Sequence, residues 1–247
     1  MLLRSEPPAD ATDVPRGGPF VVWFDRTPAP ASVHRGSVRL ESGATRHPLA
    51  VRVDPVERRI VAVPLEGVLL EPQTTYRLRL EGIRGFDGVE IEPVEIRFRT
   101  GREAGEPSEE SRPTPSWSRI RSLLTRSCAT AGCHDERTRA VGLDLGSAEG
   151  VETTAIGVPA RGVAAPVSGE GTRAASVLVG LPLIDVVAGA GRPAWSYLVY
   201  KVTGEPGIAG EPMPPPASGL PELSLEERHL LAGWIAAGAP TSEEGHR

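Results

Sequence analysis

Residues 74–82, with the sequence TTYRLRLEG, decide the fold of the first part of this chain. Apolar and charged side chains alternate through them, and the same alternation returns in VEIRFRT at residues 94–100. A period of two is typical of a β strand with one buried face and one face in water. Four earlier segments, FVVWF, SVRLES, LAVRV and RRIVAV, are also short, apolar and separated by turn residues. Together the six segments predict an antiparallel β sandwich.

The same region carries an L-x-P-x-T-x-Y segment, formed by Leu70, Pro72, Thr74 and Tyr76, and ends in FRT. In these features it resembles bacterial Ig-like domains over residues 7–100. The resemblance implies an all-β Ig-like sandwich in which the Tyr76 hydroxyl holds the preceding loop in place. Such domains serve as spacers or adhesive modules, so the resemblance predicts a fold and leaves the function open.

Residues 101–115, GREAGEPSEESRPTP, indicate an exposed acidic linker, because they are rich in Pro, Ser and Gly and lack an apolar period. Helical periodicity follows, with an apolar stripe that begins at Trp117 and ends at Leu124. Near the C-terminus, LSLEERHLLAGWIAAGAP predicts a second amphipathic helix with Ser224 as N-cap and Glu227 as its capping-box partner. Between the two helices, SYLVYKV fits a third helix or a strand.

The charge pattern limits the partners that we expect. The net charge is −5, and acidic and basic residues are interspersed without a basic block, so neither nucleic acid nor an anionic membrane is an expected partner. No run of about 18 apolar residues occurs, so no transmembrane segment is predicted. The N-terminus, MLLRSEPPADATD, has no apolar signal region, and we expect an export signal, such as a lipoprotein signal, to be missing from this chain. No G-x-S-x-G, P-loop or H-E-x-x-H motif is present, so the sequence does not support a hydrolase. We do not expect an enzyme.

The segment SCATAGCHDE, residues 127–136, contains the chain's two cysteines, Cys128 and Cys133, and His134 follows the second directly. Three chemistries fit this arrangement. A structural disulfide explains the cysteines alone, and a closed zinc site needs a fourth ligand beyond these three residues. Covalent haem explains the order Cys…Cys-His, although its usual spacing is C-x-x-C-H and the spacing here is C-x4-C-H. The small residues of the ATAG spacer allow a bulge between the two thiols.

Met213 is the chain's second methionine after Met1, and it lies in the proline-rich segment GEPMPPPASG. A methionine more often fills a gap in a core than it occupies such a loop. A proline-rich loop holds a side chain in place without regular structure, as a thioether ligand of iron requires. Met213 is therefore the candidate sixth ligand of a haem iron. Its occurrence in the same chain as a Cys, Cys, His motif favours the haem hypothesis.

Six motifs in order give the C-terminal part a resemblance to the cytochrome c-like domains of large secreted bacterial proteins. They are C-x4-C-H at 128–134, GLDL at 142–145, G-x-P-x-x-SYL at 191–198, MP at 213–214, L-S-x-E-E at 223–227 and WI-x-x-GA at 234–239. The resemblance covers residues 116–240 and implies a mainly α domain with one covalent haem c. Cys128 and Cys133 would form the thioethers, with His134 as the proximal and Met213 as the distal axial ligand of the iron.

The leading hypothesis is therefore an exported mono-haem c-type electron-transfer protein, periplasmic or on the cell surface, with an Ig-like spacer and an unidentified redox partner protein. Six-coordinate iron has no open position for a substrate, which favours electron transfer over catalysis. The alternative is a non-haem structural or interaction protein in which Cys128 and Cys133 form a disulfide. Both hypotheses predict export, because haem attachment and disulfide formation take place outside the reducing cytosol.

Overall fold

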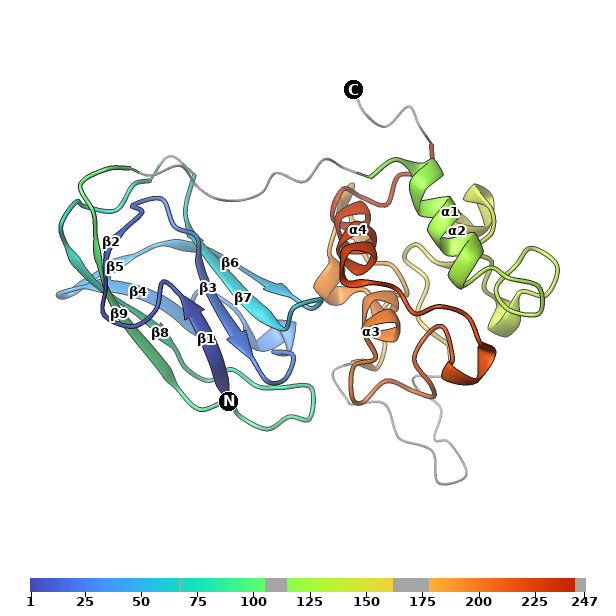
Figure 1. Ribbon diagram of the computed structural model, residues 1–247, viewed down its shortest axis with the longest axis horizontal. Helices are drawn as coiled ribbons and strands as arrows, with labels where there is room; N and C mark the ends of the chain where they lie inside the picture. The colour runs from blue at the N-terminus through green and yellow to red at the C-terminus, as the bar shows by residue number, and fades with distance from the viewer. Residues whose placement is uncertain (67, 105–114, 162–177, 243–247) are drawn as a thin grey trace. The chain divides into compact units, whose positions relative to one another are not determined.

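The structure, a computed structural model, describes residues 1–66, 68–104, 115–161 and 178–242. It divides into unit 1, Met1–Ser111, and unit 2, Arg112–Arg247. Figure 1 shows the β sheets of unit 1 and the short helices of unit 2. The described part of unit 2 holds four α helices and one small hairpin. Most of the expected linker, residues 105–114, lies outside the described residues.

Unit 1 is a sandwich of two sheets, so the expected β fold is found there. The four-stranded sheet has the order β1 (Leu2–Glu6), β3 (Phe20–Phe24), β7 (Arg59–Pro64), β6 (Leu49–Asp54). The five-stranded sheet has the order β2 (Ala11–Val14), β9 (Val94–Thr100), β8 (Thr75–Leu80), β4 (Val38–Ser42), β5 (Thr45–His47). The six predicted segments form β3, β4, β6, β7, β8 and β9, whereas β1, β2 and β5 were not predicted. All neighbouring strands are antiparallel except β2 and β9, which run parallel.

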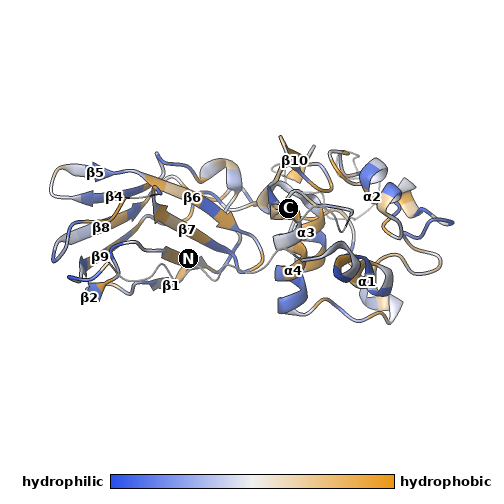
Figure 2. Cartoon of the chain, turned by 90° about the horizontal axis from the view of Figure 1, so that it is seen from above, coloured by the Kyte–Doolittle hydropathy of each residue, from blue (hydrophilic) through white to orange (hydrophobic). Residues whose placement is uncertain are grey.

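The core of unit 1 lies between the two sheets and is built on aromatic rings. The ring centroids of Phe20 and Phe98 are 5.0 Å apart, and those of Tyr76 and Phe98 are 5.8 Å apart. Tyr76 is 0% exposed, and its hydroxyl accepts the Glu71 N–H at 2.9 Å. The predicted corner tyrosine is thereby confirmed. Hydrophilic and hydrophobic residues alternate along the strands of this unit in Figure 2, as the period of two requires.

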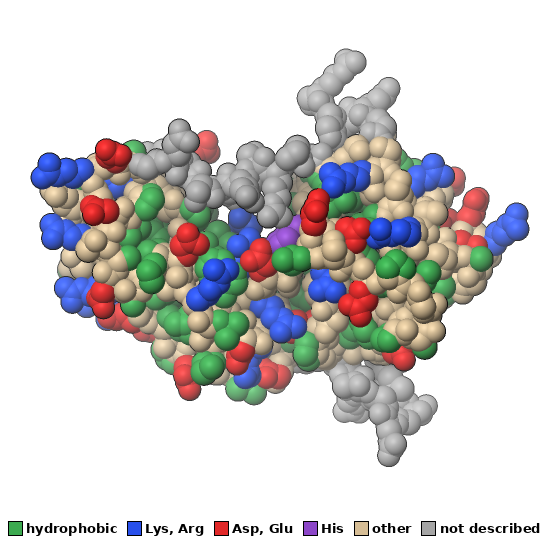
Figure 3. All heavy atoms as spheres, viewed as in Figure 1, with side chains coloured by type: hydrophobic (Ala, Val, Ile, Leu, Met, Phe, Trp, Pro, Cys, Tyr) green, Lys and Arg blue, Asp and Glu red, His purple; other side chains and the backbone are tan. Residues whose placement is uncertain are grey.

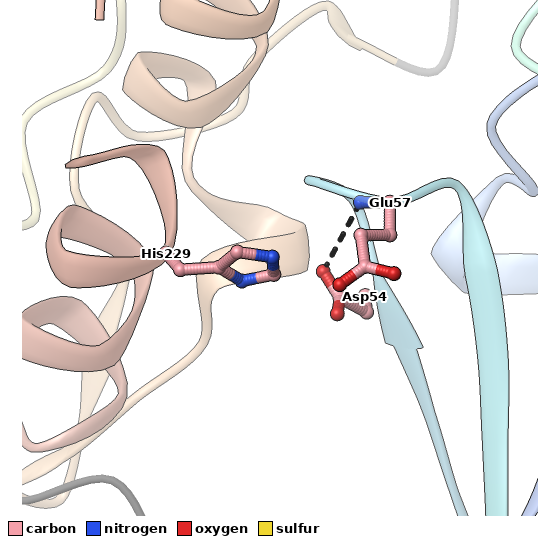
Figure 4. A group of neighbouring side chains, drawn as sticks. All are labelled: Asp54, Glu57 and His229. Carbon is pink, nitrogen blue, oxygen red and sulfur yellow. Dashed lines mark hydrogen bonds between the residues drawn. The ribbon is translucent and has the colours of Figure 1, made fainter. Parts of the chain in front are cut away.

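The turn between β6 and β7 is fixed by one buried carboxylate. Asp54 accepts the N–H groups of Val56 at 3.0 Å and Glu57 at 3.4 Å, the second of which is drawn in Figure 4. Its other oxygen accepts from Arg59 Nε at 2.9 Å. An aspartate that binds the backbone two residues on is a common turn-former. Here it sets the register of a hairpin whose six residue pairs run from Leu49 to Asp54 without a bulge.

Unit 2 contains short helices that are separated by loops longer than the helices themselves. The α helices are α1 (Trp117–Ser127), α2 (Ala148–Thr154), α3 (Tyr197–Thr203) and α4 (Leu225–Ala236). Single 3-10 turns occur at η1 (Pro30–Ser32) in unit 1 and at η2 (Ala140–Gly142), η4 (Pro193–Trp195) and η5 (Pro216–Ser218) in unit 2. The rings of Trp117 and Trp234 stack with centroids 6.0 Å apart, so α1 and α4 pack against each other as their apolar stripes predict. SYLVYKV forms a helix, α3.

The expected mainly α, cytochrome c-like domain is wrong as a fold class. The four α helices have 11, 7, 7 and 12 residues, and the strands of the described chain contain more residues than its α helices. The individual helix signals were correct: Ser224 and Glu227 form the predicted capping box of α4. None of the described helices is both long enough and apolar enough to cross a membrane.

A small hairpin packs closely on the C-terminal end of α4. Its two strands, β10 (Val186–Val187) and β11 (Ala190–Gly191), have two residues each. A β carbon built on Gly191 would lie 1.5 Å from the Ile235 carbonyl oxygen. One built on Gly238, which has φ +91°, would lie 2.4 Å from the carbonyl oxygen of Gly189. Because both obstacles are backbone atoms, the close approach of hairpin and helix requires glycine at these two positions.

We expect Gly191→Ala to lower the free energy of unfolding of unit 2 by about 3 kcal/mol, because backbone atoms must move to admit the new methyl group. Urea unfolding followed by tryptophan fluorescence measures the change. Gly233→Ala is the matched control, since its β carbon would lie 3.9 Å from Pro115 and alanine favours the helix by up to about 1 kcal/mol. Equal destabilisation by both variants would contradict the close approach.

We expect Tyr76→Phe to destabilise unit 1 by about 1–2 kcal/mol, because the Glu71 N–H loses its acceptor while the ring stays in the core. The measurement is the urea midpoint of the full chain, with an unchanged m-value. A variant as stable as the natural protein would show that the hydroxyl does not hold the loop.

Candidate functional site

The segment with the two cysteines forms a compact turn at the end of α1. Cys128 is the C-cap of the helix, and its N–H donates to the Leu124 carbonyl at 2.8 Å. The chain then folds back, so that the His134 N–H donates to the Cys128 carbonyl at 3.2 Å. Gly132 takes φ +86°, a conformation that suits glycine. The ATAG spacer therefore forms a loop whose two ends are joined by this backbone hydrogen bond.

The two thiols have different surroundings. The Cys128 side chain is buried, with the residue 6% exposed, and burial raises the pKa of its thiol to about 12. Cys133 is half-buried, and both cysteines are free, so the predicted disulfide is absent. Among the described residues, neither cysteine joins His134 in a group of three ligand atoms within 4.8 Å of one another. The positions of Cys128, Cys133 and His134 therefore do not support a zinc site.

His134 is held by a hydrogen bond to a strained turn. Its Nδ1 lies 3.1 Å from the Ala140 carbonyl oxygen, which the turn presents to it. Arg139 and Val141, on either side of Ala140, have φ values of +44° and +51°, which residues with side chains rarely adopt. Burial lowers the pKa of the His134 imidazole, and the hydrogen bond partly offsets this effect.

Met213 lies on a loop that is fastened to α3 through Lys201. The Met213 N–H donates to the Lys201 carbonyl at 2.8 Å. The Lys201 ammonium donates to the carbonyl oxygens of Ala209, at 2.9 Å, and Glu211. Burial lowers the pKa of Lys201, and its charge in turn contributes to the lowered pKa of His134. The loops of His134 and Met213 therefore both lie near this lysine.

The prediction of a covalent haem c is wrong, because the residues present do not fit the group. Thioether formation requires two thiols that are open to the same porphyrin, whereas the Cys128 thiol is enclosed by protein and the Cys133 side chain is half-exposed. The spacing is C-x4-C-H, and the surrounding unit is built of loops and short helices instead of a mainly α domain. The assigned roles of Cys128, Cys133, His134 and Met213, and the electron-transfer function that depended on them, are corrected accordingly.

Unit 1 carries a second candidate site, which was not predicted from the sequence. It lies on the side of the five-stranded sheet that faces away from the core. We call it the arginine face and define it by the charged residues of β4, β5, β8 and β9 that alternate with the buried ones, together with Glu81 just after β8. It comprises six arginines and three glutamates: Arg39, Arg46, Arg77, Arg79, Arg97, Arg99, Glu41, Glu81 and Glu95. In the view of Figure 3, basic, acidic and apolar side chains are interspersed on the surface of unit 1.

The three glutamates of the arginine face are all engaged in ion pairs. Glu81 pairs with Arg39, and Glu95 pairs with Arg79 at 2.8 Å. Glu41 lies 3.8 Å from Arg46 and 4.0 Å from Arg79.

The other three arginines of the face, within the described residues, have no carboxylate partner. Arg77 Nη2 donates to the Gly43 carbonyl at 3.4 Å, and Arg99 Nε donates to the Gln73 carbonyl at 3.2 Å. Arg97 lies directly opposite Arg77 in the ladder between β8 and β9. Positive charge is therefore in excess over the centre of the sheet.

The signal for this face was present in the sequence as Arg-x-Arg, at residues 77–79 and again at 97–99. A period of two places both arginines of each pair on one side of a strand. The charges appeared interspersed along the chain because apolar core residues separate them. Pairing β8 with β9 then brings the two Arg-x-Arg segments side by side.

Comparisons with known proteins show no family for this chain. No family model and no curated protein matches it. Among solved structures, it is similar to CopC from Methylosinus trichosporium OB3b, with a TM-score of 0.35 and 14% identity over 45% of this chain and 98% of that one. PcoC, a copper resistance protein from Escherichia coli, gives a TM-score of 0.33 and 19% identity over 40% and 98% of the two chains. The N-terminal part of the bacterial S-layer protein SbsC gives a TM-score of 0.33 and 14% identity over 40% of this chain, which spans 23% of that structure.

We expect Cys133 to react with a thiol reagent at least about 100-fold faster than Cys128, because the Cys128 thiol is buried and its pKa is raised, whereas Cys133 is only half-buried. Timed alkylation followed by peptide mass spectrometry measures both rates, and denaturation should release the second thiol. Cys133→Ser is the control and should leave one slow thiol. Equal rates, or a native mass that is lower by two hydrogens, would contradict the positions of the thiols.

Proposed function

We propose that this chain is a non-haem interaction protein without enzymatic activity, in which unit 1 contacts a partner and unit 2 is a separate structural unit. This is the alternative that the sequence left open, without the disulfide. The haem hypothesis, in contrast, required an open pair of thiols, and Cys128 is buried.

The arginine face is the observation that carries this proposal. Strands β8 and β9 use one side to close an apolar core, and their other side carries charged groups that are exposed or partly exposed to water. Transition-state stabilisation relies on charges that are preorganised in a site from which water is excluded. A solvated array of charges on the outer side of a sheet supports recognition of a complementary surface instead.

Two partly buried polar side chains of unit 2 support the same conclusion through their local roles. His134 bonds to the Ala140 carbonyl, and the Lys201 ammonium fastens the loop before Met213. Each of these bonds holds a loop in place. The predicted location, the periplasm or the cell surface, is part of the proposal.

We expect the full chain to co-sediment with the isolated envelope of the cells that produce it, in a saturable manner. Sedimentation at increasing protein concentration, with a globular protein of similar net charge as reference, measures the binding. Met213→Ala combined with Cys133→Ser should bind as the natural chain does, because the proposal places the contact in unit 1. A chain that stays in the supernatant at every concentration would contradict the proposed function.

A further inference from the structure

The arginine face of unit 1 keeps like charges together at a cost to stability. In the ladders, Arg77 lies directly opposite Arg97, and Arg39 lies directly opposite Arg79. Directly opposed like charges destabilise an antiparallel pair. Ion pairs with Glu41 and Glu95 offset the repulsion at Arg79. Arg77 and Arg97 have no carboxylate partner among the described residues. Folding alone gives no reason for this pair.

We propose that the arginine face binds an anionic polysaccharide through the repeated carboxylate or sulfate groups of the polymer. The inference rests on the proposed interaction function and names the class of partner. Arginine has a planar fork of donors that matches carboxylate and sulfate oxygens in a bidentate manner. Arg77, Arg97 and Arg99 form the centre of the site.

A polymer fits this site better than a small anion does. Opposed residues on neighbouring strands are about 5 Å apart, and alternate residues of one strand are about 7 Å apart. The sheet thus places Arg77, Arg97 and Arg99 at neighbouring points of one grid of outward positions. A single exposed ion pair contributes little, whereas several such pairs along one chain reinforce one another. This arrangement therefore favours a ligand with repeated negative charges over a small anion.

The side-chain composition of the face distinguishes a polysaccharide from other polyanions. Proteins that bind single-stranded nucleic acid stack bases on aromatic side chains, and the outward positions of β8 and β9 hold only Thr75, arginines and Glu95. A protein partner is usually held by a desolvated apolar centre, which these outward positions do not provide. A hydrated polymer that is bound through its charges requires neither feature.

Binding of the full chain to heparin, as the sulfated probe, and to polygalacturonate, as the carboxylated probe, tests the proposal by biolayer interferometry. The double variant Arg77→Glu/Arg97→Glu should bind at least about 10-fold more weakly than the natural chain. Arg35→Glu/Arg121→Glu makes the same change in net charge at exposed positions outside the face and should bind as the natural chain does. Affinity should fall steeply as salt rises. Comparison of the two probes identifies the anionic group.

Arg97→Glu alone separates binding from folding. It creates a pair of opposite charges with Arg77, so the melting temperature should stay the same or rise, while affinity should fall. A loss of stability together with affinity would assign Arg97 a structural role and overturn the proposal. So would equal weakening by the control pair, or binding only to vesicles that contain phosphatidylglycerol. Envelope binding without any polysaccharide binding would overturn the inference and leave the proposed function standing.

Discussion

The pairing of β8 with β9 is the contact on which unit 1 depends, because both faces of the sheet are defined by it. Tyr76 and Phe98 are directly opposed in this ladder and stack in the core. A slip of one residue would turn every side chain of a strand to the other face, and arginines would replace the aromatic rings between the sheets. The apolar core therefore fixes the register, and the register places Arg77 opposite Arg97. The arrangement of charge on the outside is a consequence of packing on the inside.

Much of the local structure could be predicted from the sequence, because short-range chemistry decides it. A period of two gave six strands, and Ser224 with Glu227 gave the start of α4. The Tyr76 hydroxyl bond followed from the resemblance to Ig-like domains and is present. The motifs of the C-terminal part were equally local, and several of them mark real helices.

The fold class of unit 2 and the cofactor that it could hold depend on the residues between the motifs. The predictions of both were wrong. The spacing C-x4-C-H says nothing of how deeply each thiol is buried. In the structure Cys128 is buried, whereas Cys133 is half-buried. The arginine face was missed for a related reason: charge was judged by its order along the chain, whereas strand pairing decides which charges become neighbours.

The placement of the cations in this chain is also consistent with a surface for binding. Lys201 is the chain's one lysine, and its ammonium is turned toward the carbonyl oxygens of Ala209 and Glu211, where it holds a loop. A compact ammonium with three donors suits that task, because it can gather several carbonyl oxygens at once. The outer side of β8 and β9 carries arginines, whose rigid forks recognise oxyanions at the surface of a partner. If positive charge served only to keep unit 1 in solution, opposed arginines would be a poor arrangement, since the same charge scattered over the surface would avoid their repulsion. Their placement in one ladder is better explained by a ligand that neutralises them together.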